Sequence, residues 1–204
     1  MILLTVSLAY VLGSIPFGVI VGRWYGADPL LSGSGRIGAS NAYRATGSKR
    51  AKWLTLIGDL LKGMGAVAFA GALTHNPWAV ALAALAAIVG HNYSCFLGLR
   101  GGAGSTPNVG ALLVIHPPTG LVIGILGLVL WSKIKIASIA SLIVLILILA
   151  DVVLLVLRGT LATPYLLYGV GQAVLITWSL RPNFKALREG RERRVEPLPP
   201  TATE

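Results

Sequence analysis

The sequence predicts an all-α fold, a polytopic membrane helix bundle of about seven transmembrane helices. Of the 204 residues, 55% are hydrophobic and only 12% are charged, and the mean hydropathy is +0.77. A soluble domain of this size could not cover so much apolar surface with so few charges. Apolar stretches near the ~20 residues that a bilayer helix needs recur along the chain, and two basic clusters require an odd number of crossings.

Six apolar stretches are visible, and the first starts at residue 1. That stretch, MILLTVSLAYVLGSIPFGVIVG, lacks the basic leader of a secretory signal, so we expect an uncleaved membrane span. All five tryptophans lie at predicted helix ends, where an amphipathic indole ring prefers the membrane interface. The stretches cover residues 1–22, 53–73, 77–97, 109–131, 134–157 and 161–180.

The basic residues argue against six crossings. Six of them lie between the first two stretches, from Arg23 to Lys52, and six more lie in the tail, from Arg181 to Arg194. An even number of crossings would place these clusters on opposite sides of the membrane, which the positive-inside rule disfavours. An odd number places both clusters in the cytoplasm and the N-terminus outside.

The extra crossing is expected from the fourth stretch, VGALLVIHPPTGLVIGILGLVLW, where His116 precedes two prolines. Adjacent prolines remove two backbone donors and clash with the preceding turn, so they break a helix. We predict a short helix at 106–116 and a second helix at 118–131. Because 11 residues of helix cover only about 16 Å, the short helix must be shielded by protein or lie beside a polar cavity.

Residues 1–192 are expected to form one integral-membrane domain, and residues 193–204, which end in EPLPPTATE, a disordered cytoplasmic tail. The single cysteine, Cys95, cannot form an intramolecular disulfide. No Cys/His cluster has metal-site spacing, so no metal site is expected. The net charge of +10 lies in short loops between apolar stretches. This placement disfavours a nucleic-acid partner and favours anionic lipids or a phosphorylated substrate.

Three polar, glycine-bearing strips fall on the cytoplasmic side of this topology. They are GSGRIGASNAYRATG at 33–47, LRGGAGSTPNVG at 99–110 and LRPNFKALREGRE at 180–192. The first strip matches the dinucleotide fingerprint Gly-x-Gly-x-x-Gly by letter, but it follows a membrane helix and no βαβ pattern surrounds it.

The first strip nevertheless has the chemistry of an anion site. Glycines allow positive φ and close backbone approach, so successive N–H groups can converge on an anion. Ser34 adds a hydroxyl donor, and Arg36 and Arg44 add planar guanidinium groups that suit phosphate oxygens. The alternative is a flexible interfacial loop whose arginines touch lipid headgroups, and this strip alone does not choose between the two.

The second strip places Arg100 beside Gly101, Gly102 and Gly104, and His91 of GHNYS precedes it near the same membrane face. Each feature alone is compatible with a simple turn or an interfacial histidine. Two glycine-rich strips with arginines on one face favour a shared phosphate site.

Charged residues within the apolar stretches are the remaining polar signal. Asp59 and Lys62 in LIGDLLKGMGAV are spaced i, i+3, so they share a helical face and can pair. They face either the bundle interior or, by snorkelling, the membrane surface. Asp151 in LILADVVLL has no partner at helical spacing. The His-x4-Asp acyltransferase dyad, a Walker A loop, a zinc motif and a Gly-x-Ser-x-Gly elbow are all absent.

Several segments, in order and spacing, resemble the bacterial acyl-phosphate:glycerol-3-phosphate acyltransferase family from about residue 10 to 192. These are LGSIPFGVIVGR, GSGRIGASNAYRATG, GDLLKG, GHNYSCFLGLRGG and RPNFKALREGRE. The resemblance implies a bacterial inner-membrane enzyme, with seven helices and a cytoplasm-facing site. It moves a fatty acyl group from acyl phosphate to the 1-hydroxyl of glycerol 3-phosphate, giving lysophosphatidic acid and phosphate for phospholipid synthesis. It implies a monomer with no metal or cofactor.

The resemblance also assigns site residues. It implies catalytic roles for Ser34, Arg44, His91 and Asn183, with Arg44 and Ser34 binding phosphate and Asn183 orienting substrate. It matches Asp59 and Lys62 to a segment between the motifs. The implied phosphate-binding residues are Gly33, Gly35, Arg36, Gly38, Asn41, Arg100, Gly101, Gly102, Gly104, Lys62 and Glu192.

The chain departs from the family pattern at a few positions. Arg36 replaces an asparagine, Ala103 replaces a lysine that contacts phosphate, and Ser105-Thr106-Pro107 replaces Val-Ala-Thr. Leu30 and Leu180 stand where an arginine and a histidine are expected. The alternative function is therefore a degenerate paralogue that binds phosphorylated lipid precursors or regulates an active partner. A phosphate-ester transporter is disfavoured, because the glycine breaks lie near one face rather than at the midplane.

Overall fold

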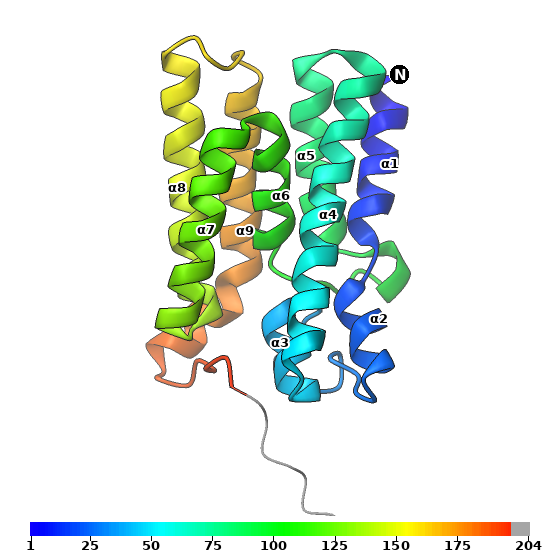
Figure 1. Ribbon diagram of the computed structural model, residues 1–204, viewed down its shortest axis with the longest axis vertical. Coiled ribbons are helices and arrows are strands. Elements are labelled where there is room, and N and C mark those ends of the chain that lie inside the picture. Colours follow the sequence, from blue (N-terminus) through cyan, green and yellow to red (C-terminus); the bar gives the residue numbers. More distant parts are fainter. Residues whose placement is uncertain (197–204) are drawn as a thin grey trace, which may run out of the picture.

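The computed structural model describes residues 1–196, which form nine α-helices and one short 3-10 helix, without a strand (Figure 1). The all-α prediction is therefore confirmed for the described residues. The elements are α1 (Ile2–Ser14), α2 (Phe17–Trp24), α3 (Ala39–Thr46), α4 (Lys49–Thr74), α5 (Pro77–Asn92), η1 (Cys95–Leu97), α6 (Ser105–Ile115), α7 (Pro117–Ile134), α8 (Ala137–Leu157) and α9 (Tyr165–Arg188).

Within residues 1–196, five helical stretches are long and apolar enough to cross a membrane: Ile2–Trp24, Lys49–Thr74, Pro77–Leu97, Pro117–Ile134 and Ala137–Leu157. The shorter α6 and the more polar α9 run alongside them (Figure 1). The fold is thus that of a multi-pass membrane protein, whereas a count of seven crossings stays a prediction.

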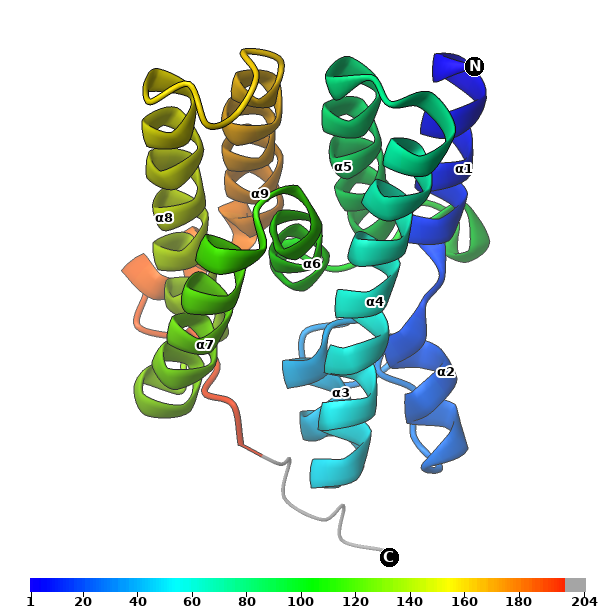
Figure 2. The same cartoon turned by 45° about the horizontal axis from the view of Figure 1, so that its top comes forward.

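The predicted break at His116 is confirmed. α6 ends at Ile115, and Pro117 and Pro118 occupy the first positions of α7, where the missing N–H groups leave no intrahelical bond unmade. The short α6 lies between α4 and α9 (Figure 2), and five of its eleven residues are buried. Glycine allows this close packing, because a Cβ at Gly63 of α4 would overlap the Pro107 backbone. Protein therefore shields the short helix, as its length requires.

The first apolar stretch, predicted at 1–22, is not one continuous helix. α1 ends at Ser14 and α2 begins at Phe17, because Pro16 lacks an N–H and disfavours helical geometry at Ile15. The break frees the Ile15 carbonyl, which accepts a hydrogen bond of 2.9 Å from Lys62 Nζ of α4. A buried lysine thus compensates for an interrupted helix.

The last apolar stretch, predicted to end at 180, continues as α9 through Pro182 to Arg188. The proline removes the N–H that would pair with the Trp178 carbonyl. Arg181 Nε donates to that carbonyl instead, at 3.1 Å. The third stretch, predicted at 77–97, consists of α5, which ends at Asn92, and the 3-10 helix η1 at Cys95–Leu97.

Both basic segments lie at the same end of the molecule. The loop between α2 and α4 and the C-terminal end of α9 are at the bottom of Figure 1, and the N-terminus is at the top. Residues 193–196 of the predicted tail lie against the bundle, where the Val195 N–H donates to the Lys135 carbonyl at 2.7 Å. Residues 197–204 lie outside the described residues, so their predicted disorder stays a prediction.

A buried polar network ties α6, α8 and α9 together. The Tyr168 hydroxyl donates to Asn108 Oδ1 at 2.7 Å, and Asn108 Nδ2 donates to Gln172 Oε1 at 2.8 Å. Gln172 Nε2 then donates to the Leu145 carbonyl of α8 at 3.0 Å. All three side-chain partners are fully buried, and such satisfied networks fix the relative positions of helices.

Candidate active site

A cavity of about 350 Å³ opens between α4, α6, α7 and α8, near the end that carries the basic segments. One part is apolar and is lined by residues such as Leu113, Ile125 and Val144. The other part is polar and draws on all three glycine-bearing strips. Its polar lining includes Ser34, Arg36, Asn41, Arg44, Asp59, His91, Ser105, Asn183 and Glu192.

Asn41 gives the first strip its shape. Its Nδ2 has two N–H donors, which three carbonyls share, those of Pro29, Ser32 and Arg36 at 2.7, 3.1 and 2.8 Å, and its Oδ1 accepts from the Ser34 N–H at 2.9 Å. The amide is only 2% exposed, so the loop folds around it. The Asn41 bonds hold Ser34 at the cavity wall, in the loop that leads to α3.

Gly33 lies in the same turn but does not line the cavity. Its φ of 59° is left-handed, and a Cβ there would overlap Asn41 Oδ1. Gly35, with a φ of 67°, has the same conformational role. Gly33 and Gly35 therefore shape the turn, whereas Gly38, which is also a predicted phosphate-binding residue, lines the cavity.

Two arginines bring positive charge to the polar part. Arg44 of α3 is 7% exposed, and it donates from Nε to the Arg194 carbonyl at 2.9 Å and from an Nη to the Arg193 carbonyl at 3.1 Å. A guanidinium has five N–H donors, so three remain for a ligand. The Arg36 guanidinium donates to the Ser179 carbonyl of α9. Burial lowers the pKa of both guanidinium groups, but arginine remains charged at neutral pH.

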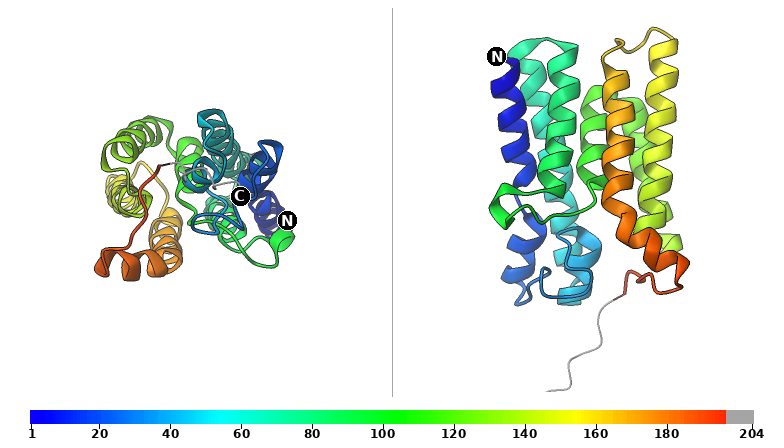
Figure 3. Two further views of the ribbon diagram at one scale, coloured as in Figure 1. Left: turned by 90° about the horizontal axis from the view of Figure 1, so that it is seen from below. Right: turned by 180° about the vertical axis from the view of Figure 1, so that it is seen from behind.

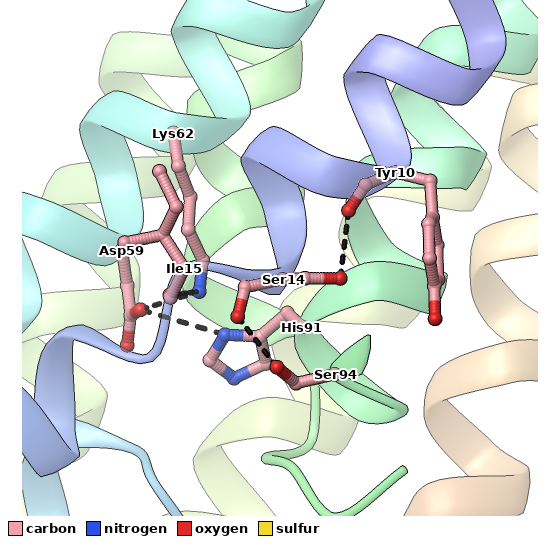
Figure 4. A network of polar contacts seen from close by, with 7 residues as sticks. All are labelled: Tyr10, Ser14, Ile15, Asp59, Lys62, His91 and Ser94. Atoms are coloured by element: carbon pink, nitrogen blue, oxygen red, sulfur yellow. Dashed lines mark hydrogen bonds and ion pairs between the residues drawn. The ribbon is translucent and has the colours of Figure 1, made fainter. Parts of the chain in front are cut away.

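Asp59 and Lys62 of α4 form the predicted ion pair, with Nζ and Oδ1 2.9 Å apart (Figure 4). Both side chains are 1% exposed, so the pair faces the bundle interior rather than the membrane surface. His91 of α5 joins them, since its Nδ1 lies 3.4 Å from the same Asp59 oxygen. Lys62 itself does not line the cavity. It forms an ion pair with Asp59 and donates a hydrogen bond to the Ile15 carbonyl.

The second strip brings the start of α6 to the cavity. Gly104, with a φ of 86°, precedes the helix, and Ser105 and Thr106 of the first turn line the cavity. The first N–H groups of a helix have no intrahelical partner and favour anions. Gly102 packs on His91, because a Cβ there would overlap the ring at Nε2. The imidazole therefore points at this turn.

The third strip contributes one oriented amide. Asn183 Nδ2 donates to Glu192 Oε1 at 2.8 Å, and Ser138 Oγ of α8 donates to the same oxygen at 2.7 Å. Asn183 Oδ1 is buried and has no hydrogen-bond partner among the described residues. An oriented acceptor is thus presented at the cavity wall.

Most of the predicted site residues lie together, with five exceptions. Arg100 is exposed and Gly101 packs on the backbone of His91 and Asn92, so neither lines this cavity. Gly33, Gly35 and Lys62 support the site from behind. The predicted residues that do line it are Ser34, Arg36, Gly38, Asn41, Arg44, His91, Gly102, Gly104, Asn183 and Glu192.

Sequence reasoning missed several polar partners. Ser105 lines the cavity with a buried hydroxyl that has no hydrogen-bond partner among the described residues. Ser138 holds Glu192 from a different helix. Asp151, which has no partner at helical spacing, accepts from Thr119 Oγ1 of α7 at 2.7 Å. No local pattern indicates such contacts between distant segments.

Comparison with known proteins identifies the family of this chain. Residues 3–190 match the family described as glycerol-3-phosphate acyltransferase. A glycerol-3-phosphate acyltransferase of Rubrobacter xylanophilus is 42% identical over 192 residues, which cover 94% of each chain. One from Thermus thermophilus is 40% identical over 195 residues, again covering 94% of each chain.

The fold is also similar to a solved structure. The crystal structure of PlsY, an integral membrane glycerol 3-phosphate acyltransferase in its glycerol 3-phosphate form, superposes with a TM-score of 0.83 at 30% sequence identity. The match covers 95% of this chain and 94% of the other. Family and fold therefore agree over nearly the whole length.

Proposed function

The chain belongs to the glycerol-3-phosphate acyltransferase family, and on that premise we propose that it transfers a fatty acyl group from acyl phosphate to the 1-hydroxyl of glycerol 3-phosphate. The products are lysophosphatidic acid and inorganic phosphate, which makes the reaction a step of phospholipid synthesis. The enzyme works as a monomer, without metal or cofactor.

Acyl phosphate is supported as the acyl donor by the division of the cavity into a polar and an apolar part. Its polar part contains Arg36, Arg44 and the start of α6, and its apolar part runs along α7 and α8. Acyl phosphate has the same two parts, a charged head and a hydrocarbon chain. The apolar wall includes Gly120, Gly124 and Gly127, which share a face of α7 and line the cavity without side chains of their own.

The reaction needs no protein nucleophile, because phosphate is a good leaving group. The glycerol hydroxyl oxygen attacks the acyl carbon, a new C–O ester bond forms, and the bond between the acyl carbon and the phosphate oxygen breaks. Holding two anions together raises their effective concentration. Arg44, Ser34 and the N–H groups of α6 offset the repulsion and stabilise charge on the departing phosphate.

The hydroxyl proton has two acceptors in reach. A phosphate monoester with a second pKa near ~6 can take it. His91 is the rival base, since an Nδ1–H directed at Asp59 leaves Nε2 free to accept on the side of Gly102. Asn183 Oδ1 orients the glycerol hydroxyl.

Arg36 supplies charge that Ala103 does not. Ala103 lines the cavity between Gly102 and Gly104 and carries no charge, whereas Arg36 lines the same cavity from the first strip. The two positions face one space, so a cation from either can reach a bound phosphate.

We place the protein in the bacterial inner membrane with seven crossings, the N-terminus outside and the cavity facing the cytoplasm. The support is the arrangement of α1 to α9, in which both basic segments lie at one end (Figure 1). Positive-inside topology then assigns that end to the cytoplasm.

The test is turnover by the purified protein with palmitoyl phosphate and glycerol 3-phosphate. Phosphate release and lysophosphatidic acid are measured together, and Ala103→Lys is assayed beside the natural chain. We expect the natural chain to turn over. Activity in the variant alone would identify a degenerate paralogue, and binding of phosphate esters without turnover in either protein would identify a different substrate.

A further inference from the structure

A second cavity lies on the other side of Arg36, between the end of α5 with its following loop and the lower half of α9. The loop and α9 are seen side by side in the right panel of Figure 3. Arg36 and Gly102 line both cavities, so the two cavities are adjacent at these residues. The proposed reaction does not by itself require a second opening.

The lining of this second cavity is basic. It contains Arg36, Arg181 and Lys185, and no carboxylate is among the described residues that line it. Arg181 and Lys185 are spaced i, i+4 on α9, so both side chains lie on the same helical face. Such an arrangement attracts anions, because its positive charges are not neutralised locally.

Arg181 is held in position rather than free in solvent. Its guanidinium carbon lies 3.0 Å from the centroid of the Trp178 ring, and its Nε donates to the Trp178 carbonyl at 3.1 Å. The Nη groups remain available. The half-exposed Trp178 ring suits the membrane interface, which puts the opening where water-soluble molecules arrive.

A buried acceptor lies at the junction of the two cavities. Asn92 is 4% exposed, and its Nδ2 donates to Ser179 Oγ at 2.8 Å. Its Oδ1 has no hydrogen-bond partner among the described residues and lies beside Gly104 of the first cavity. The junction therefore offers cations for a phosphate and an acceptor for a hydroxyl.

We propose that the second cavity is a separate entrance for the water-soluble phosphate monoester, glycerol 3-phosphate, while acyl phosphate occupies the first cavity. This inference rests on the proposed function. A dianion from the cytoplasm meets Arg181 and Lys185 first and then reaches Arg36. The hydrocarbon chain of the acyl donor does not pass this way, so the two substrates do not compete for one route.

The test separates the two substrates in steady-state kinetics of the full-length protein. For Arg181→Ala/Lys185→Ala, we expect the KM for glycerol 3-phosphate to rise at least fivefold at low salt. The KM for palmitoyl phosphate and the kcat stay within twofold. The rise shrinks as ionic strength screens the cavity charges. Arg188→Ala is the matched control, because Arg188 is a cation of the same helix that lines neither cavity.

Three outcomes would overturn the inference: an unchanged KM for glycerol 3-phosphate, an equal rise in both KM values, or an effect seen only when anionic lipid is varied. The last would assign the basic cavity to lipid headgroups. A natural chain without turnover would instead contradict the proposed function. Equilibrium binding of glycerol 3-phosphate to the natural and doubly substituted proteins then decides the inference, with weaker binding expected for the double variant.

Discussion

Arg44 is fixed at its Nε and one Nη by two main-chain carbonyls and is almost fully buried. Its remaining donors form a planar fork that a lysine ammonium cannot reproduce. We expect Arg44→Lys to lower kcat/KM about 10- to 100-fold, because a lost hydrogen bond to a charged group is worth roughly 1.5–3 kcal/mol.

The measurement is the initial rate of phosphate release in detergent. Arg50→Lys is the control, since Arg50 is an exposed arginine of the first turn of α4 at the same end of the molecule. Equal rates for the two variants would contradict a phosphate-binding role for Arg44.

Asp59 balances a lysine that is buried in the bundle. Asp59→Asn leaves Lys62 without an opposite charge, and breaking such a pair costs about 3–5 kcal/mol. We expect a large fall in the thermal unfolding midpoint in detergent. The exposed pair of Asp28 and Arg23, also 2.9 Å apart, provides the control. Asp28→Asn is expected to cost less than ~1 kcal/mol, so similar losses in both variants would argue against a buried charge at Lys62.

The contacts of Asp59 and Asp151 show which pairings sequence spacing can predict and which it cannot. Spacing alone predicts the pairing of Asp59 with Lys62, because both lie on one helix. It does not predict His91 as the third member, which comes from α5. The partner of Asp151 is Thr119, 32 residues away, so no periodicity could indicate it.

Among the helices, α7 presents a row of glycines to the apolar part of the cavity. A Cβ at Gly124 would lie 3.3 Å from Val109 Cγ1, so a larger side chain must occupy cavity space. We expect Gly124→Leu to shift preference from palmitoyl to decanoyl phosphate by about tenfold in relative kcat/KM, since about two buried CH₂ groups at ~0.8 kcal/mol each lose their place. Val129→Leu is the control, because Val129 is on the same helix, is 47% exposed and does not line the cavity. An unchanged preference in Gly124→Leu would place the acyl chain elsewhere.

The prolines show which helix boundaries sequence can give. The break before Pro117 is predicted correctly, because two successive prolines leave no helical alternative. Pro16 also breaks a helix, and Pro182 does not. In α9 the Trp178 carbonyl accepts from Arg181 of the same helix, and the Ser179 carbonyl accepts from Arg36 of the distant first strip. Local sequence does not indicate the second of these contacts.

At the scale of the whole bundle, charge and hydrophobicity predict the shared face of the polar strips better than they predict the ends of the helices. Counting basic clusters led to one shared face for three strips, and Ser34, Gly102 and Asn183 do line one cavity. The exposure of Arg100 was not predictable, because a glycine-rich turn can direct a neighbouring side chain either way. The contact of Arg44 with the tail segment joins residues 150 positions apart, and it too has no sequence signature.

The orientation in the membrane gives the last prediction. The start of α4 and the α8–α9 loop lie at opposite ends of the bundle (Figure 1). Lys49 is the first residue of α4, Ala162 belongs to the loop, and both are exposed. Because Cys95 is the single cysteine, Cys95→Ser provides a background for Lys49→Cys or Ala162→Cys. In intact cells, a membrane-impermeant maleimide should label Ala162→Cys, and it should label Lys49→Cys only after permeabilisation. The reverse pattern would turn the cavity outward, away from the cytoplasmic supply of glycerol 3-phosphate, and labelling of both in intact cells would contradict an odd number of crossings.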